Sequence, residues 1–188
     1  MGPRRQWKKV GTMRVIAGAL KGRRLKAPAW EGLRPTSDKL RETLFNILAP
    51  RIAGARVLDG FAGTGAIGIE AISRGAAHVT FVEQDRRAQA LIADNLAHCG
   101  IADGYAMIRA SVSRALAGLR AASFDIMIFD PPYDHQPDVA LAAAADRLAP
   151  GGLLVLEHAR RRAAPESAGP LARTRQVFSG DSALSFYS

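Results

Sequence analysis

The chain has 188 residues, 48% of them hydrophobic and 23% charged, which is ordinary for one compact globular domain. A single cysteine, Cys99, excludes an intrachain disulfide and a cysteine-rich metal site. The net charge of +9 favours an anionic partner, with nucleic acid as the first candidate.

The composition also indicates where the protein works. A chain that can form no disulfide of its own is typical of a reducing compartment, so we expect a cytoplasmic protein. No apolar run approaches the roughly 18 residues of a membrane span, and the N-terminus does not fit a secretory signal. We therefore expect no membrane association, and we also expect a monomer without a metal.

Basic residues are concentrated at the N-terminus. Before the first acid, Glu31, the chain carries Arg4, Arg5, Lys8, Lys9, Arg14, Lys21, Arg23, Arg24 and Lys26. A one-sided cluster is what phosphate binding needs, although a merely solvated tail is the alternative. The residues expected to contact RNA are Arg14, Lys21, Arg23 and Arg24. Residues 1–12 are expected to be a disordered extension, with Met13 as an alternative start.

The first predicted elements are a β-hairpin and a helix. Two short apolar stretches within residues 13–25 flank a turn with Gly and Lys, which predicts a hairpin in a small appendage over 13–33. A helix with apolar residues at helical spacing follows, capped by Thr36 or Ser37 and stopped by Pro50.

From residue 56 onward, strands and helices alternate. Strands are predicted at 56–59, 78–83, 105–109, 124–130 and 153–157, and helices up to about 74 and at 86–98, 112–119 and 137–148. This alternation predicts an α/β, Rossmann-like parallel sheet with helices on both faces, in a domain over 34–188. After a loop at 160–172, strands at 175–178 and 183–187 are expected to form an antiparallel hairpin.

The most informative segment runs from Val57 to Gly68. A strand ends at Asp59 and leads into a glycine-rich turn, after which a helix begins with free N–H groups towards a ligand. Gly63 and Gly65 belong to a G-x-G-x-x-G pattern, which alone is weak evidence. The segment predicts a nucleotide-type ligand, with a purely structural turn as the alternative.

Two acidic residues discriminate between possible ligands. A carboxylate at Asp59 would repel the pyrophosphate of a dinucleotide but suits a cation. Glu83 ends the next strand and can accept hydrogen bonds from ribose hydroxyls. A nucleoside with a positive sulfonium fits both acids, so we predict S-adenosylmethionine as the cofactor. The predicted contacts in this region are Asp59, Phe61, Gly63, Thr64, Gly65 and Glu83.

A second motif, Asp130-Pro131-Pro132-Tyr133, follows a buried strand that we expect beside the strand ending in Asp59. An exocyclic base amine is a poor nucleophile, and Asp130 can accept one of its N–H groups and offset developing charge. The rigid Pro131 carbonyl can accept the other, and Tyr133 offers a stacking face for a flipped base. These four residues are the predicted catalytic corner. A structural turn is the alternative, and the proton acceptor stays open between Asp130 and water.

Further segments complete a family pattern. They are Met13–Gly18, Arg34–Asp38, Arg41–Leu48, Ser73–Ala76, Phe81–Glu83 and Ala183–Tyr187. With the glycine turn and the catalytic corner, they make residues 13–188 resemble the bacterial 16S ribosomal RNA guanine-N2 methyltransferases of the RsmD type. The turn and the corner are shared by many methyltransferases, whereas the Arg-Pro-Thr and Phe-Asn-Ile-Leu segments indicate this family.

The resemblance implies a seven-stranded methyltransferase sheet and methyl transfer to the N2 of one guanine, at position 966, in 16S rRNA. It implies that the substrate is an assembled or partly assembled small subunit. It also implies that residues 34–45 line the pocket, so we expect Arg34 and Thr36 to contact the cofactor and Arg41 to contact RNA.

Two positions depart from the family pattern. Gly60 stands where relatives usually carry a larger apolar residue, so we expect a looser turn there. Ser111 stands where many relatives have Asp or Asn against the adenine amine, and a hydroxyl is expected to accept that bond more weakly.

Three other functions stay open at this stage. An adenine-N6 methyltransferase would use the same corner. A protein-glutamine methyltransferase would favour Asn over Asp130 and has no use for the basic charge. A non-catalytic RNA-binding assembly factor would keep the basic segment, but the intact Asp130 and Tyr133 argue against it.

Overall fold

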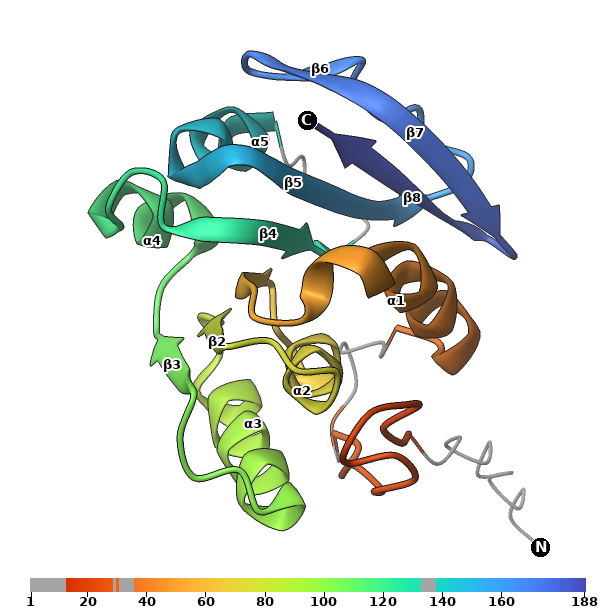
Figure 1. The fold of residues 1–188 in the computed structure, drawn as a ribbon, viewed down its shortest axis with the longest axis vertical. Helices are drawn as coiled ribbons and strands as arrows, with labels where there is room; N and C mark the ends of the chain where they lie inside the picture. The colour runs from red at the N-terminus through yellow and green to blue at the C-terminus, as the bar shows by residue number, and fades with distance from the viewer. Residues whose placement is uncertain (1–12, 29, 31–35, 133–137) are drawn as a thin grey trace, which may run out of the picture.

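The computed structural model describes residues 13–28, 30, 36–132 and 138–188 (Figure 1). Arg34, Tyr133 and the extension over 1–12 lie outside the described residues, so their predicted roles stay predictions. Within the described part of the chain, no helix is long and apolar enough to cross a membrane.

One eight-stranded sheet organises the chain, in the order β3-β2-β1-β4-β5-β8-β7-β6. The strands are β1 (Arg56–Gly60), β2 (His78–Val82), β3 (Tyr105–Ile108), β4 (Phe124–Phe129), β5 (Leu148–Ala159), β6 (Ser167–Ala168), β7 (Leu171–Ser179) and β8 (Ser182–Tyr187). The first five run parallel, and β8, β7 and β6 are antiparallel. The α/β class, the parallel sheet and the closing hairpin are therefore confirmed, with eight strands in place of seven.

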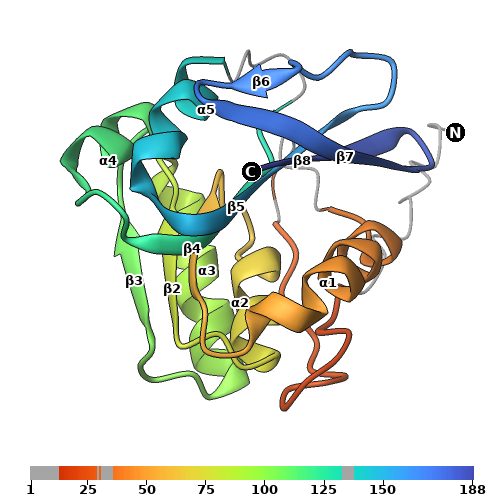
Figure 2. The same ribbon diagram turned by 45° about the horizontal axis from the view of Figure 1, so that its top comes forward.

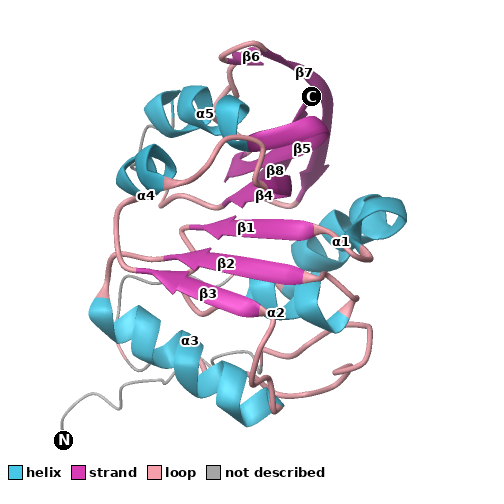
Figure 3. Ribbon diagram, turned by 60° about the vertical axis from the view of Figure 1, so that its left-hand side comes forward, coloured by secondary structure: helices cyan, strands magenta, loops and turns pink. Residues whose placement is uncertain are grey.

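Helices cover both faces of the sheet, as Figure 3 shows. They are α1 (Asp38–Ile52), α2 (Ala66–Ser73), α3 (Arg86–Cys99), α4 (Val112–Gly118), α5 (Asp138–Ala144) and the short 3₁₀ helix η1 (Ala145–Arg147). The first three pack in one hydrophobic core and α4 and α5 in the other, because alternate strand residues such as Ile128 and Phe129 point to opposite faces.

Several predicted boundaries were wrong. The helix expected to stop at Pro50 continues for two further residues, to Ile52. The strand β5 starts at Leu148, where a helix was expected to reach. Part of the expected loop over 160–172 forms β6 and the start of β7, and Figure 2 shows this hairpin beyond β5.

The N-terminal segment packs against the main body. The expected hairpin is reduced to one bridge between Arg14 and Arg24. Met13, Val15 and Leu25 are nevertheless buried in the same core as α1 and α2. The segment therefore occupies a defined place on the surface of the sheet domain.

Arg41 is a structural residue and its predicted contact with RNA is wrong. Its side chain is completely buried, so it cannot reach a phosphate outside the protein. Its Nη2 donates to the carbonyl of Arg14 at 2.7 Å and to the carboxylate of Asp38 at 2.6 Å. Arg41 therefore ties the N-terminal segment to the start of α1.

Glu70, on α2, completes this attachment from the other side. Its carboxylate is fully buried and accepts the backbone N–H groups of Ile16 at 2.7 Å and Ala17 at 3.0 Å. The same carboxylate accepts from Nε of Arg74 at 2.7 Å and lies 4.0 Å from Nη1 of Arg41. Glu70 and Arg41 are thus two buried opposite charges that lie close together, and both hydrogen-bond the backbone of the segment.

We predict that Arg41→Ala lowers the free energy of unfolding by about 3 to 5 kcal/mol, the usual effect of breaking a buried ion pair. Urea denaturation followed by circular dichroism measures the change. Arg24→Ala is the matched control, because Arg24 is exposed, and its effect should stay within about 0.5 kcal/mol. Equal stability of the two variants would contradict the assignment.

Candidate active site

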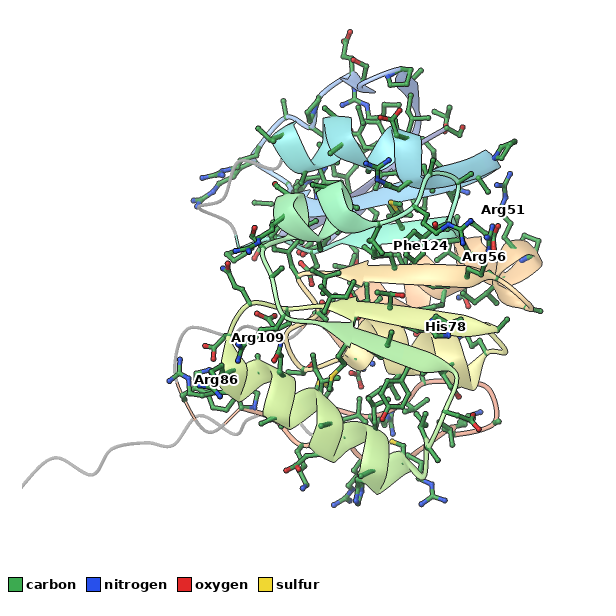
Figure 4. All side chains as sticks on the ribbon, turned by 90° about the vertical axis from the view of Figure 1, so that its left-hand side faces the viewer. Arg51, Arg56, His78, Arg86, Arg109 and Phe124 are labelled. Atoms are coloured by element: carbon green, nitrogen blue, oxygen red, sulfur yellow. The ribbon has the colours of Figure 1, made fainter. Side chains whose placement is uncertain are left out.

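A cavity of about 810 Å³ opens at the carboxyl ends of the parallel strands. Figure 4 orients the sheet: Arg56, His78 and Phe124 mark the amino ends of three strands, and Arg86 and Arg109 follow the carboxyl ends of β2 and β3. The predicted site residues in the wall are Thr36, Phe61, Gly63, Thr64, Glu83, Ser111, Asp130, Pro131 and Pro132. The fold thus brings together segments that lie almost a hundred residues apart in the chain.

The glycine turn has the unusual backbone that its sequence predicts. Gly63 and Gly65 adopt positive φ angles of 55° and 77°, and Phe61 adopts 64°, which is rare for an aromatic residue. Such strain persists where the surroundings enforce it, and it is frequent at functional sites. Ala62 donates to the carbonyl of Val82, so the turn is held against the end of β2.

Glu83 is an acid of the wall whose carboxylate is held in a defined orientation. One carboxylate oxygen accepts the N–H of Gly63 at 2.9 Å, and the other accepts those of Gln84 at 2.8 Å and Asp85 at 2.9 Å. Three donors fix the carboxylate without burying it, and its oxygens keep further lone pairs for a ligand. The position fits the predicted acceptor of ribose hydroxyls, which stays a prediction.

Asp59 lies behind the cavity wall, not in it. Its side chain is buried, one oxygen accepts the N–H of Gly68 at 2.9 Å, and the other has no partner among the described residues. Burial raises the pKa of Asp59 to about 8, against the lowering effect of the Gly68 bond. Asp59 therefore holds the start of α2 against β1, and its predicted contact with the cofactor stays a prediction. Gly65 likewise does not reach the wall.

Asp130 forms the centre of the predicted catalytic corner. The β1–β4 pairing predicted from sequence is confirmed, and the N–H of Asp130 donates to the carbonyl of Gly60 at 3.3 Å. The hydroxyl of Thr36 donates to the Asp130 carboxylate. Pro131 is buried beside it, and Pro132 is exposed.

Glu157 is a site residue that the sequence reasoning missed. It lies in the cavity wall and hydrogen-bonds Asp130, because the pairing of Phe129 with Leu156 sets the next residues of β4 and β5 side by side. Burial raises the pKa of Asp130 well above its ordinary value, and the hydrogen bond and negative charge of Glu157 raise it further. An acid at the end of a buried strand was the available signal, the same one that identified Asp130.

Gly60 has a packing reason that the sequence did not reveal. A Cβ at this position would lie 2.6 Å from Cδ1 of Phe129, so a larger residue fits only if the Phe129 ring shifts. The Phe129 ring is buried and contacts Phe61 edge to face, with 6.1 Å between centroids. The expectation of a looser turn is therefore wrong, because this ring fills the space.

The remaining predicted contacts lie at the edges of the site. Ser111 caps α4 by accepting the N–H of Arg114 at 3.4 Å, and it lines the cavity with Ala110 and Val112. The four predicted RNA contacts on the N-terminal segment are exposed: Arg14, Lys21, Arg23 and Arg24. Among the described residues, no group of three or more His, Cys, Asp or Glu is arranged to hold a metal ion.

Comparison with known proteins now places the chain. A family model described as "Conserved hypothetical protein 95" matches residues 13–188. The chain belongs to this family. A Bacillus subtilis (strain 168) member, "Putative rRNA methyltransferase YlbH", is 40% identical over 180 residues, covering 93% of this chain and 98% of the relative.

Two further relatives of this family member agree with the resemblance to RsmD-type enzymes. "Ribosomal RNA small subunit methyltransferase D" of Escherichia coli (strain K12) is 43% identical over 123 residues, covering 65% of this chain and 61% of the relative. The solved structure titled "Putative methyltransferase yhhF from Escherichia coli" superposes with a TM-score of 0.82 at 34% identity, covering 94% and 97% of the two chains. The resemblance seen in the sequence is confirmed at the level of the family.

The buried acid Asp59 predicts a pH dependence of stability. Its pKa is about 8 in the folded chain and 3.8 ordinarily, so between these values the folded chain binds more protons than the unfolded chain. The contribution of Asp59 to stability is therefore lost as pH rises from about 4 to 8. Asp59→Asn should flatten this decline, measured by urea denaturation at pH 5 and pH 8.

The pKa of Asp130 is also raised, so Asp130 adds its own decline of stability with rising pH. In Asp59→Asn the slope of stability against pH should therefore decrease without vanishing. Asp103→Asn, on an exposed loop, is the control and should keep the slope of the parent chain. An unchanged slope in Asp59→Asn would show that Asp59 is ionised in the folded protein.

Proposed function

We propose that this family member transfers a methyl group from S-adenosylmethionine to the exocyclic N2 amine of a guanine in 16S rRNA. The observation that carries the proposal is the shared cavity, in whose wall Asp130 and Pro131 lie together with Gly63 and Glu83. A base-recognition corner and a nucleoside-type pocket thus open into one space.

The residues present fit S-adenosylmethionine. The cavity of about 810 Å³ lies in the range of small-molecule sites. Glu83 would hold the ribose, the turn at Phe61 and Gly63 would contact the amino-acid part, and Ser111 with its neighbours would contact the adenine. When bound, this cofactor supplies an electrophilic methyl group on a positive sulfonium. The negative charge of Glu83 and of the Asp130–Glu157 pair suits a cation there.

Asp130 and Pro131 are suited to hold a base amine. The carboxylate can accept one N–H of the amine and the Pro131 carbonyl can accept the other, which orients the nitrogen lone pair. The bond from Asp130 N–H to the Gly60 carbonyl, 3.3 Å long, keeps this corner in register with the glycine turn. Thr36 fixes the carboxylate from a third direction.

The Asp130–Glu157 pair is suited to receive the proton that the amine loses. Two hydrogen-bonded carboxylates retain one proton between them and carry one negative charge, so the pair can take up a second proton. In that step an N–H bond of the amine breaks, its electron pair stays on nitrogen, and an O–H bond forms on the pair. The doubly protonated Asp130–Glu157 pair then returns a proton to water through the cavity.

The substrate assignment rests on the relatives and on charge. A relative is named as a small-subunit rRNA methyltransferase, and this chain carries a net charge of +9 with exposed cations on its N-terminal segment. We infer the N2 amine of the guanine at position 966, in an assembled or partly assembled subunit, as the target. We also infer that the protein works in the cytoplasm as a monomer without a metal.

The decisive experiment uses 30S subunits from a strain that lacks the corresponding enzyme. Incubation with the full chain and S-adenosylmethionine, followed by mass spectrometry of the nucleosides, should reveal N2-methylguanosine at one position. N6-methyladenosine would support the alternative methyltransferase, and no modified nucleoside with bound subunits would support a non-catalytic assembly factor.

We predict that Asp130→Ala abolishes transfer while the affinity for S-adenosylmethionine stays within about tenfold, because the carboxylate acts on the amine during attack. Single-turnover methylation and calorimetry measure the two quantities. Asp103→Asn, exposed and far along the chain, is the control. Normal turnover in Asp130→Ala would refute the assignment of this residue.

Glu157→Gln should slow turnover about 100-fold, a typical contribution of a proton acceptor, and leave cofactor affinity nearly unchanged. Because Glu157 raises the pKa of Asp130, its neutral replacement lowers that pKa. The ionisation of Asp130 in the pH profile of kcat should therefore move to lower pH. Glu42→Gln, exposed on α1, is the control. A profile that coincides with that of the parent chain would exclude Glu157 from proton transfer.

A further inference from the structure

A basic groove of about 460 Å³ lies where β5 leaves the sheet and β7 returns to it. We define the arginine groove by six of the residues that line it: Arg160, Arg161, Arg162, Arg173, Gln176 and Phe178. Its wall also contains one acid, Glu166, so positive charge dominates the surface.

The three consecutive arginines of the groove are exposed, and none forms an ion pair within the described part of the chain. Other arginines differ, since Arg56 is paired with Asp125 and Arg87 with Asp85. Adjacent like charges repel each other, so the cluster lowers its energy most when an anion covers it. Closely spaced phosphates are an anion of matching charge density.

Phe178 adds an aromatic face to this charge. Its side chain is 50% exposed, although its neighbour Val177 packs against the core. The guanidinium of Arg160 lies over the ring, 5.2 Å from its centroid. An exposed ring beside arginines is the usual arrangement on which single-stranded nucleic acids stack a base, because stacking and phosphate contacts then act together.

The groove adjoins the candidate active site. The N–H of Arg160 donates to the carbonyl of Asp181 at 2.7 Å, and Ala159 pairs with Ser182. The turn from Ser179 to Ser182 lines the active-site cavity. A strand of RNA that enters the cavity with one base can therefore continue across this turn into the groove.

We propose that the arginine groove binds single-stranded RNA next to the target nucleotide, with phosphates at Arg161 and Arg162 and a base against Phe178. The inference rests on the proposed function, since it extends the path of the same substrate. It assigns RNA contact to the C-terminal part of the chain, which the sequence reasoning had treated as a loop and a closing hairpin.

The test measures binding of a fluorescein-labelled, mixed-sequence single-stranded RNA to the full chain by fluorescence anisotropy at several salt concentrations. The double variant Arg161→Ala with Arg162→Ala should lower the slope of log Kd against log salt by about 1.4, the value for two phosphate contacts. That change corresponds to about 25-fold weaker binding at about 0.1 M salt.

The matched control is Arg51→Ala with Arg120→Ala, which removes the same charge near the amino ends of the parallel strands, where Figure 4 labels Arg51. Its slope should stay within about 0.3 of the parent value. Equal losses in both double variants would overturn the proposal, because binding would then depend on net charge alone. Failure of the parent chain to bind the RNA would also overturn it.

Phe178 is tested separately with Phe178→Leu and Phe178→Ala. Both should weaken binding about tenfold without changing the salt slope, because both lose the stacking face. Parent-like affinity in Phe178→Leu would overturn the stacking contact. Neither binding assay needs turnover or the methyl donor. Weaker RNA binding by these variants would therefore support the groove even if the chain forms no methylguanosine. If the groove variants bind RNA and methylate as the parent chain does, the groove does not bind RNA, and the proposed function is unaffected.

Discussion

The lateral alignment of β1, β4 and β5 is the constraint on which the site depends. Asp59 faces Ile128 across one pair of strands and Phe129 faces Leu156 across the other. Acids at or just beyond the ends of these strands therefore converge on one edge of the sheet. Carboxylates resist burial together, so the continuous backbone pairing of the sheet must hold them. A slip of one residue would turn the acids to the other face.

The N-terminal segment is fixed to this framework by polar contacts more than by sheet pairing. Glu70 takes up its backbone N–H groups, and Arg41 clasps it from α1. Further along, Asn95 accepts the N–H of Lys26 at 2.7 Å and donates to the carbonyl of Thr64 at 3.0 Å. One amide therefore links the backbone of the basic segment to the glycine turn.

The sequence predicted the parts of the molecule that local patterns control. The parallel strands, the glycine turn and the position of Asp130 next to it all follow from periodicity and from the rule that ligands bind where strand order reverses. Arg41 could not be interpreted correctly in this way, because its partners Asp38, Arg14 and Glu70 are set by tertiary packing. The positive charge of Arg41 in a basic chain suggested a contact with RNA, but its complete burial excludes that contact.

Glu157 and Asp59 mark the same limit at the site itself. Both lie at strand ends, yet one reaches the cavity and the other is covered by α2, and only the packing of the helix on β1 distinguishes them. The extra length of β5 and β7 was also hidden, because Pro150 and two glycines suggested a break where the strand tolerates them near its start.

The contact between Gly60 and Phe129 has a consequence for how this family varies. A methyl group at position 60 and the ring at position 129 compete for one volume, with 2.6 Å between the would-be Cβ and Cδ1. A bulkier residue at position 60 therefore fits only where the side chain at position 129 moves or is smaller. The two sites should change in concert over evolutionary time, and either exchange made singly would meet a barrier that the paired exchange avoids.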